Sequence, residues 1–207
     1  AWRACAVATV AEWTGEDVWQ ELVDAGKRAI ELDETDAESH RIAGSLALYT
    51  RDFETAKFHF NRAIELNPNH AFIVGRMGEI HNFLGDGEAA LEYQKRAKML
   101  DPFLPEYCRE LEAIAYYVMK DFEACYCVVG EFARLTRRAA AYRVAAATHM
   151  NNSNGLVLAV RDLLSLDPGF DPKQFVLTEF YKDRSISKTL ETELQRALST
   201  ASLRLAG

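Results

Sequence analysis

The side chains best suited to metal binding and acid–base chemistry are dispersed along this chain. Its five histidines are His40, His59, His70, His81 and His149. No two histidines are four residues apart and no His-Glu-x-x-His motif occurs, so the spacing typical of a helical zinc site is missing. We interpret His40 and His81 as residues that pack between helices, and we expect no bound metal ion.

The cysteines give no sign of a disulfide framework or a zinc site. They stand at Cys5, Cys108, Cys125 and Cys127, and this spacing fits neither pattern. Cys125 and Cys127 are two residues apart on a predicted helix, so they point to different faces. We therefore expect buried, reduced thiols in a cytoplasmic protein.

Phosphate chemistry and serine chemistry have no motif here either. Gly85-Asp86-Gly87 lies between two predicted helices, whereas a phosphate-binding glycine loop follows a strand. No serine lies in a nucleophile elbow. Arg134, Arg137 and Arg138 are suited to binding an anion, although an exposed helix connection is the simpler interpretation. The sequence thus predicts no catalytic residue and no cofactor, and we expect a protein that is not an enzyme.

The composition is that of a water-soluble globular chain with an acidic balance. Of 207 residues, 49% are hydrophobic and 27% charged, and no apolar run reaches the roughly 18 residues of a membrane span. The net charge of −7 argues against nucleic acid or an anionic membrane as a partner. The chain opens with Ala1-Trp2-Arg3, without a start methionine or a signal peptide, so we interpret it as a fragment of a longer protein.

A repeat organises the middle of the chain. Small residues and prolines recur 34 positions apart, as Gly44 and Gly78, Ala56 and Ala90, Ala63 and Ala97, and Pro68 and Pro102. A step of 34 residues that holds two helices is typical of the tetratricopeptide repeat, and this stretch resembles that family.

The residues of one repeat explain how its helices meet. Ala56, Phe60 and Ala63 follow one another at helical spacing and form an apolar stripe. Gly44 and Ala56 are small where the two helices are expected to cross. In the next repeat, Gly85 stands between the helices, where a left-handed cap is expected. Such a pair has to stack on neighbours to bury its apolar face.

The resemblance implies an all-α, superhelical solenoid of antiparallel helix pairs, closed by a helical tail. We expect an array over residues 1–171, with clear repeats at 37–70 and 71–104 and degenerate repeats at 1–36, 105–136 and 137–171. Among the expected helices are 2–13, 18–32, 122–135, 137–150 and 155–166. Residues 172–207, called the tail below, are predicted to form capping helices, one of them around 186–203.

In a stack of this kind the first helix of each pair lines a concave groove. The positions that usually face it hold Arg41, Tyr49, Phe72, Arg76, Glu79, Asn82, Phe83, Tyr107, Glu110, Tyr117 and Tyr142. Aromatic residues and arginine are enriched at binding hot spots, so we predict a groove for a protein or peptide segment. The alternative is that several of these residues pack against neighbouring helices or the tail. We expect the tail to cap the last helix pair and leave the groove free.

One known kind of groove ligand is disfavoured. Repeats that bind chaperone C-termini use a lysine and asparagine clamp at fixed groove positions. The corresponding positions here hold Arg41 and Ser45, then Gly75 and Glu79. The comparison therefore implies that a C-terminal carboxylate is not the ligand.

A narrower resemblance concerns the order of parts. Tyr107-Cys108-Arg109-Glu110-Leu111, then residues 163–170 (LLSLDPGF), and then Phe180-Tyr181-Lys182-Asp183 precede a closing helix. This order is similar to the C-terminal repeat region of bacterial proteins that begin with a class III adenylate/guanylate cyclase domain. Similar regions also follow winged-helix domains in bacterial regulators. No catalytic residue carries over.

These observations predict a non-catalytic protein-interaction scaffold in a bacterial signalling protein. Its partner would be a protein, a peptide segment or a neighbouring domain, with no nucleic acid and no membrane. A sensing module of a transcription regulator and an accessory repeat region of an enzyme such as a glycosyltransferase remain alternatives. A homo-oligomer also stays open.

Overall fold

The computed structural model describes residues 19–104 and 106–205, so the helix predicted at 2–13 lies outside it. All regular elements of the described residues are α-helices, which confirms the all-α prediction. In chain order these are α2 (Trp19–Leu32), α3 (Ala37–Tyr49), α4 (Phe53–Leu66), α5 (Ala71–Leu84), α6 (Gly87–Leu100), α7 (Glu106–Val118), α8 (Phe122–Gly130), α9 (Arg137–Ala147), α10 (Ser153–Leu166), α11 (Pro172–Leu177) and α12 (Arg184–Leu205). None of these helices is long and apolar enough to cross a bilayer.

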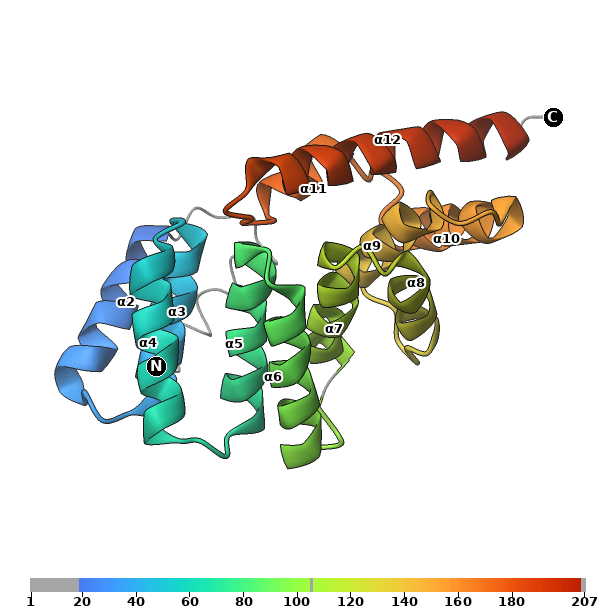
Figure 1. The fold of residues 1–207 in the computed structure, drawn as a ribbon. Coiled ribbons are helices and arrows are strands. Elements are labelled where there is room, and N and C mark those ends of the chain that lie inside the picture. The colour runs from blue at the N-terminus through green and yellow to red at the C-terminus, as the bar shows by residue number, and fades with distance from the viewer. Residues whose placement is uncertain (1–18, 105, 206–207) are drawn as a thin grey trace.

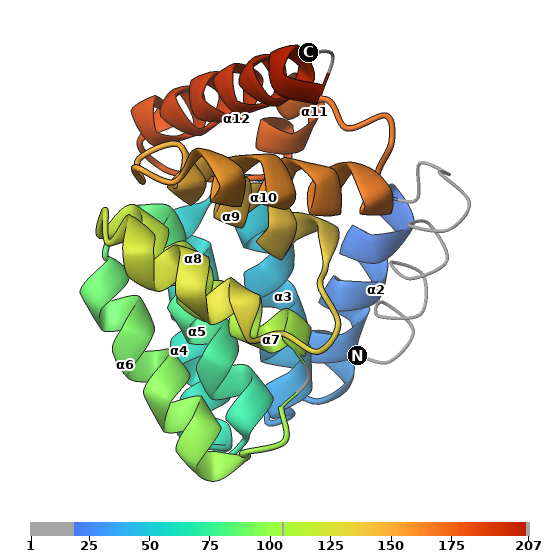
Figure 2. The same cartoon turned by 90° about the vertical axis from the view of Figure 1, so that its right-hand side faces the viewer.

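The helices pack in consecutive antiparallel pairs, as expected for the solenoid. The pairs are α3 with α4, α5 with α6, α7 with α8, and α9 with α10 (Figure 1). The first helices α3, α5, α7 and α9 also contact one another in sequence, so they form a continuous inner layer. Figure 2 shows the same stack from its end, with α10 and α12 above the earlier pairs.

Polar caps and left-handed residues set the turn within each of the first pairs. Asp52 and Asp86 are the N-caps of α4 and α6, and each side chain accepts a hydrogen bond from a backbone amide of the first turn. Before each cap the backbone is left-handed, with φ of 62° at Arg51 and 85° at Gly85, and φ is again 63° at Lys120 before α8. The left-handed cap expected at Gly85 is confirmed. At Arg51 and Lys120 the same turn occurs without glycine, at a cost of roughly 1–2 kcal/mol each.

Small residues bring the helices of a pair close together. Ala56 and Ala90 are fully buried at the crossings, as predicted. At Gly44 a Cβ atom would lie 2.5 Å from the ring of Phe60, so only glycine fits under that ring. The crossing therefore depends on a glycine in α3 and an aromatic ring in α4.

Two predicted helices are shorter than expected. The helix predicted to run to residue 135 ends at Gly130, because the ring of Phe132 leaves the helical path and packs under Arg109, with 5.0 Å from guanidinium carbon to ring centroid. The helix expected to reach residue 150 ends at Ala147, where Thr148 Oγ1 donates to the carbonyl of Ala145 at 2.7 Å. Tertiary packing and a local hydrogen bond override the helical pattern at these ends.

The tail packs on the last helix pair. Leu190, Leu194, Ala197 and Ala201 recur at helical spacing on α12 and are fully or almost fully buried. Both α9 and α10 contact α12, and α12 lies across the ends of the array in Figure 1. The capping role predicted for the tail therefore matches the packing of α12.

Candidate binding groove

The concave side formed by α3, α5, α7 and α9 carries the predicted groove residues, but they lie in three different environments. Some line an open groove, others lie beneath the tail, and the rest join neighbouring helices.

An open groove of about 810 Å³ lies between α2, α3, α5, the start of α9 and the tail. Its walls are aromatic and charged, formed by Leu22, Tyr49, Thr50, Arg76, Glu79, Phe83, Arg138, Thr178, Glu179 and Phe180. Four of the predicted residues are among them, namely Tyr49, Arg76, Glu79 and Phe83. Tyr49 is 43% exposed, and its ring centroid lies 5.1 Å from that of Phe180. The groove thus offers a partly exposed aromatic surface beside charged groups.

The charged groups of the groove are paired with one another. Arg76 Nη2 lies 2.7 Å from one carboxylate oxygen of Glu79, and Arg138 Nη1 lies 3.4 Å from the other. Arg138 also donates to both carboxylate oxygens of Glu179, at 2.8 and 2.9 Å. Burial opposes the charge of Arg138, but Glu179 and then Glu79 raise its pKa well above the ordinary value. The cation of Arg138 is therefore fixed at the centre of a chain of alternating charges.

A third carboxyl group, that of Glu110, lies near the same arginine. Glu110 is buried on α7, and burial raises its pKa above the ordinary value of 4.5. The negative charges of Glu179 and Glu79 act in the same direction, while a hydrogen bond with Thr136 and the charge of Arg138 oppose them. The neutral form of Glu110 is thus favoured more than in water.

The segment between α11 and α12, residues 178–182 and here called the inserted segment, enters the concave face. Tyr142 donates its hydroxyl to Glu179 at 2.6 Å and lies 2.7 Å from the hydroxyl of Tyr181. The amide of Lys182 donates to the carbonyl of Phe83 at 2.7 Å. The expectation that the tail leaves the groove free is therefore wrong for this part of the face, because α11 and α12 pack on the last pair with the connecting loop directed inward.

The C-terminal helix covers a further part of the predicted groove. Tyr117 is 4% exposed, and its hydroxyl donates to Glu193 of α12 at 2.7 Å. The other carboxylate oxygen of Glu193 lies 2.5 Å from Nε2 of His149. The ring of His149 stacks on Phe122 with centroids 3.7 Å apart. Tyr117 and Tyr142 thus hold the tail instead of lining an open surface.

The remaining predicted residues either make contacts between helices or have a side chain that the structure does not describe. Arg41 is buried, pairs with Glu38 at 2.7 Å and lies over the ring of Phe72 at 5.1 Å. Asn82 is fully buried and donates to the carbonyl of Leu111 at 2.8 Å, which joins α5 to α7. Tyr107 belongs to α7, but its side chain is outside the described residues.

Six of the ten residues that line the groove were not predicted as groove residues, and the three of them that carry a charge or an aromatic ring are Arg138, Glu179 and Phe180. Arg138 occupies the second position of its repeat, a position that usually faces the groove. The repeat register therefore predicts it as a groove residue, although the residue was assigned to an arginine cluster. Glu179 and Phe180 belong to the tail, which follows no repeat register. Their position depends on contacts with residues far away in the sequence, and no local pattern predicts it.

The dispersed histidines and cysteines form no reactive cluster in the described part of the chain. His40 is buried, and its Nδ1 lies 2.9 Å from Nδ1 of His59, in agreement with packing between helices. Cys125 is buried, and burial raises the pKa of its thiol, whereas Cys127 is exposed, contrary to the expectation that all thiols are buried. Among the described residues, no three His, Cys, Asp or Glu side chains are grouped as a metal site would require.

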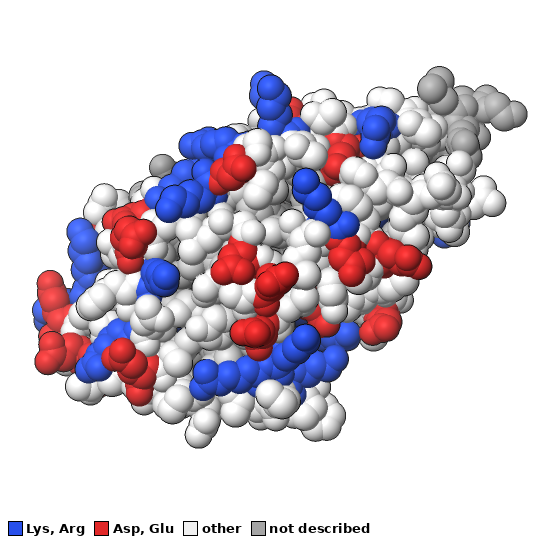
Figure 3. All heavy atoms as spheres, viewed as in Figure 1, with Lys and Arg blue, Asp and Glu red and all other residues white. Residues whose placement is uncertain are grey.

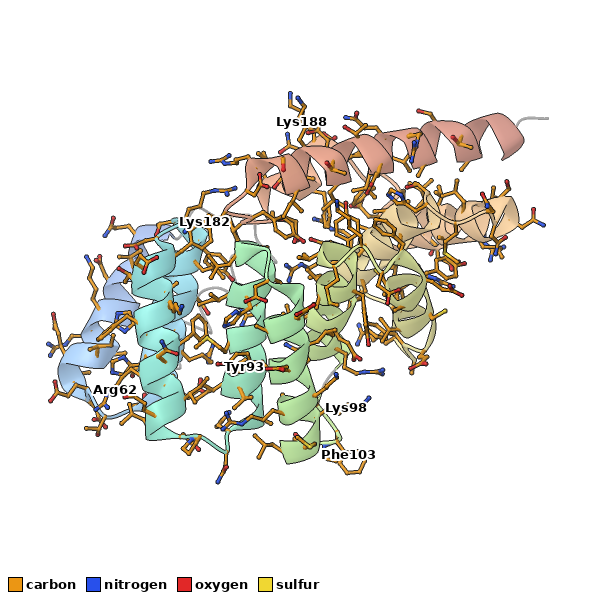
Figure 4. The ribbon with its side chains drawn as sticks, in the orientation of Figure 1. Arg62, Tyr93, Lys98, Phe103, Lys182 and Lys188 are labelled. Carbon is orange, nitrogen blue, oxygen red and sulfur yellow. The ribbon has the colours of Figure 1, made fainter. Side chains whose placement is uncertain are left out.

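Basic side chains gather where the tail meets the first repeats. Figure 3 shows Lys and Arg close together over the start of α12 and the adjoining ends of α3 and α4. The residues are Arg51, Lys182, Arg184 and Lys188, here called the basic rim, and all but Arg51 are exposed. In Figure 4 Lys182 lies beside the start of α4, and its Nζ is 5.9 Å from the ring centroid of Phe53. Burial, together with the charge of Arg184, lowers the pKa of Arg51.

Comparison with known proteins supports the repeat. Residues 38–70, which contain α4 and all of α3 except Ala37, match the sequence model of the tetratricopeptide repeat. No curated protein sequence matches the chain. Tetratricopeptide repeats are generally non-catalytic modules that bind proteins or peptides. The match and the succession of paired helices together identify residues 38–70 as a tetratricopeptide repeat within an all-helical solenoid.

Proposed function

We propose that this chain is a non-catalytic scaffold that binds a segment of another protein, or of a neighbouring domain, in the open groove beside Tyr49 and Arg76. The groove itself is the observation that carries the proposal. It combines about 810 Å³ of space with a partly exposed tyrosine and a charged floor on the concave side of the repeats. Tyrosine and arginine are enriched among the few residues that dominate the binding energy of protein interfaces.

The biological setting is part of the same proposal. The order of parts resembles C-terminal repeat regions of bacterial cyclase-like signalling proteins, so we assign the chain to the regulatory region of a larger protein of this kind in the cytoplasm. A sensing module of a transcription regulator and an accessory region of an enzyme such as a glycosyltransferase are the alternatives. The sequence of the complete gene distinguishes the three, because the domain that accompanies the repeats differs in each.

The test begins by finding what touches the groove. A photo-crosslinking amino acid at Tyr49, and another at exposed Phe58 on α4 as a control, identifies a partner whose cross-links are confined to the groove. The purified partner is then titrated against the double variant Tyr49→Ala with Arg76→Glu. We expect at least about tenfold weaker binding, because an aromatic contact is lost and a charge is reversed.

The matched control lies on the opposite side of the array. Phe58→Ala with Arg62→Glu makes the same kinds of change on α4, where Phe58 is 64% exposed and Arg62, labelled in Figure 4, pairs with Glu65. The control should leave both affinity and thermal stability close to those of the parent. If it weakened binding as much as the groove variant did, the convex face would be the binding surface and the proposal would be refuted.

A further inference from the structure

The inserted segment is held by the concave face as a short peptide ligand would be. Its main chain makes two hydrogen bonds to the array. The amide of Lys182 donates to the carbonyl of Phe83 at 2.7 Å, and the carbonyl of Tyr181 accepts from Arg51 Nη1 at 2.9 Å. Since these bonds use backbone groups of the segment, they fix its register without requiring particular side chains.

The first side chain of the segment is selected by charge and geometry. Glu179 is 1% exposed, and its carboxylate accepts two hydrogen bonds from Arg138 and one from the hydroxyl of Tyr142. A guanidinium bound through two parallel N–H groups matches a planar carboxylate. A neutral amide would direct its own N–H₂ donors at this guanidinium, so the position requires an acidic residue.

The next two side chains are selected by an aromatic surface. The ring centroid of Phe180 lies 5.1 Å from Tyr49 and 5.8 Å from Phe83. The ring of Tyr181 packs edge-on against Phe83 at 5.2 Å, and its hydroxyl reaches that of Tyr142 at 2.7 Å. Aromatic pairs in these arrangements are favourable beyond their buried area. The second position therefore takes an aromatic ring, and the third takes a ring with a hydroxyl group.

The surroundings favour an acidic ligand as well. The chain has a net charge of −7, yet Arg51 of the basic rim donates to the carbonyl of Tyr181, and Arg184 begins α12 two residues after the inserted segment. A local positive potential on an acidic protein steers an acidic segment towards that point and repels it from most of the remaining surface.

We propose that this site recognises a partner protein segment in which an acidic residue is followed by an aromatic residue and a tyrosine, with Glu179-Phe180-Tyr181 of the same chain occupying the site in its absence. The inference deepens the proposed function and rests on it, because it specifies the partner of the concave face. An attached segment has an effective concentration in the millimolar range. A partner therefore binds at this site when the inserted segment is released.

The experiment uses a fluorescent peptide with the sequence of residues 176–184 and a protein whose own segment is disabled. The variant carries Glu179→Ala, Phe180→Ala and Tyr181→Ala, and Glu179→Gln with Phe180→Ala is a milder second variant. Circular dichroism and thermal melting establish that each is folded. We expect the folded variant to bind the peptide with a Kd of about 10 μM and the unmodified chain to bind about 100-fold more weakly, since its own segment competes at a millimolar effective concentration.

Two controls address specificity. A peptide with glutamine in place of its glutamate should bind at least about tenfold more weakly. Adding Arg138→Gln to the disabled variant should abolish binding, whereas Arg137→Gln, at the exposed neighbouring arginine, should have little effect. Binding that ignored these changes would show non-specific attraction and would overturn the proposal.

The remaining outcomes are also decisive. If neither folded variant bound the peptide, the inserted segment would be a structural cap and not a ligand. If the disabled variant were monomeric while the unmodified chain formed dimers through exchanged tails, the occupant would be a second copy and the partner proposal would fail. If a cross-linked partner bound the open groove but the peptide did not bind, the inference here would fail while the proposed function stood.

Discussion

At the scale of single residues, Glu110 is the buried carboxyl group of the concave face whose charge is paired least well. Three carboxyl groups, those of Glu79, Glu110 and Glu179, lie around Arg138, and only Glu79 and Glu179 are paired with it by hydrogen bonds or ion pairs. Glu110 is 6% exposed and has a raised pKa, first because of burial. The ionised form of Glu110 therefore destabilises the folded state near neutral pH.

Replacing Glu110 with glutamine should stabilise the protein at pH 7 by roughly 1 kcal/mol, because a buried charge with incomplete pairing is removed. The sign follows from linkage. The folded state holds the Glu110 proton to higher pH than the unfolded state does, so this residue lowers stability as pH rises above its ordinary pKa of 4.5. Below pH 4.5 the two proteins should converge. Urea denaturation at pH 4 and pH 7 measures both effects.

The control for this prediction is Glu112→Gln at a half-buried position on the same helix. It should change stability by less than about 0.5 kcal/mol at both pH values. A destabilised Glu110→Gln variant at pH 7 would mean that Glu110 is charged in the folded state and supports Arg138.

At the scale of the helix, the crossing of α3 and α4 should be intolerant of one methyl group. Gly44→Ala places a Cβ atom 2.5 Å from the ring of Phe60, and we expect a cost of roughly 1–3 kcal/mol from overpacking. The buried Gly75 of α5 is the matched control, since its added Cβ would lie 3.5 Å from that of Ala97, an ordinary contact. Gly75→Ala should be neutral or stabilising by roughly 0.5–1 kcal/mol because alanine favours the helix. Thermal melts of the two variants with equal shifts would contradict this account.

Helices and crossings were largely predictable because their causes are local. Asp52 and Asp86 cap helices 34 residues apart, and Ala56 and Ala90 recur at the crossings with the same step. The end of α8 at Gly130 was not predictable in the same way. There the position of Phe132 is decided by Arg109 on another helix, and a sequence window around Phe132 does not contain that information.

The groove was predictable only in part, because part of it is formed by contacts between residues far apart in the sequence. The repeat register assigned Tyr49, Arg76 and Phe83 to the concave side. It carried no information on the tail, because the residues that place the tail are far apart in the sequence: Arg51 bonds to Tyr181 across 130 positions. Side chains that bind a partner and side chains that bind the chain's own tail are of the same types, so composition does not separate them.

At the scale of the whole molecule, the contact between α12 and the array should control how the last helices open. Glu193→Ala removes the acceptor of the buried Tyr117 hydroxyl and the partner of His149. We expect a loss of roughly 1–3 kcal/mol, the cost of leaving a buried polar group unsatisfied. Hydrogen exchange should accelerate in α12 and at the ends of α7 and α9, where Tyr117 and His149 lie, more than in α3 and α4.

Gln195→Ala serves as the control, because Gln195 is exposed and its side chain donates to Glu191 within α12. It should change the free energy of unfolding by less than about 0.5 kcal/mol. If exchange in α12 were the same in both variants, the hydrogen bonds of Glu193 would not hold the tail in place.

The tail gives this solenoid a mechanical property that a plain repeat array lacks. An array whose repeats contact only their neighbours can bend and twist along its length, and the width of its concave face changes as it bends. Here the tail packs on α9 and α10 at one end, while Arg51 and the carbonyl of Phe83 hold it near the other. Because the tail is attached near both ends of the repeat array, it fixes the curvature of the array. While the inserted segment stays in place, a partner that enters the open groove meets a surface of set width and docks nearly as a rigid body, whereas release of the segment removes this constraint.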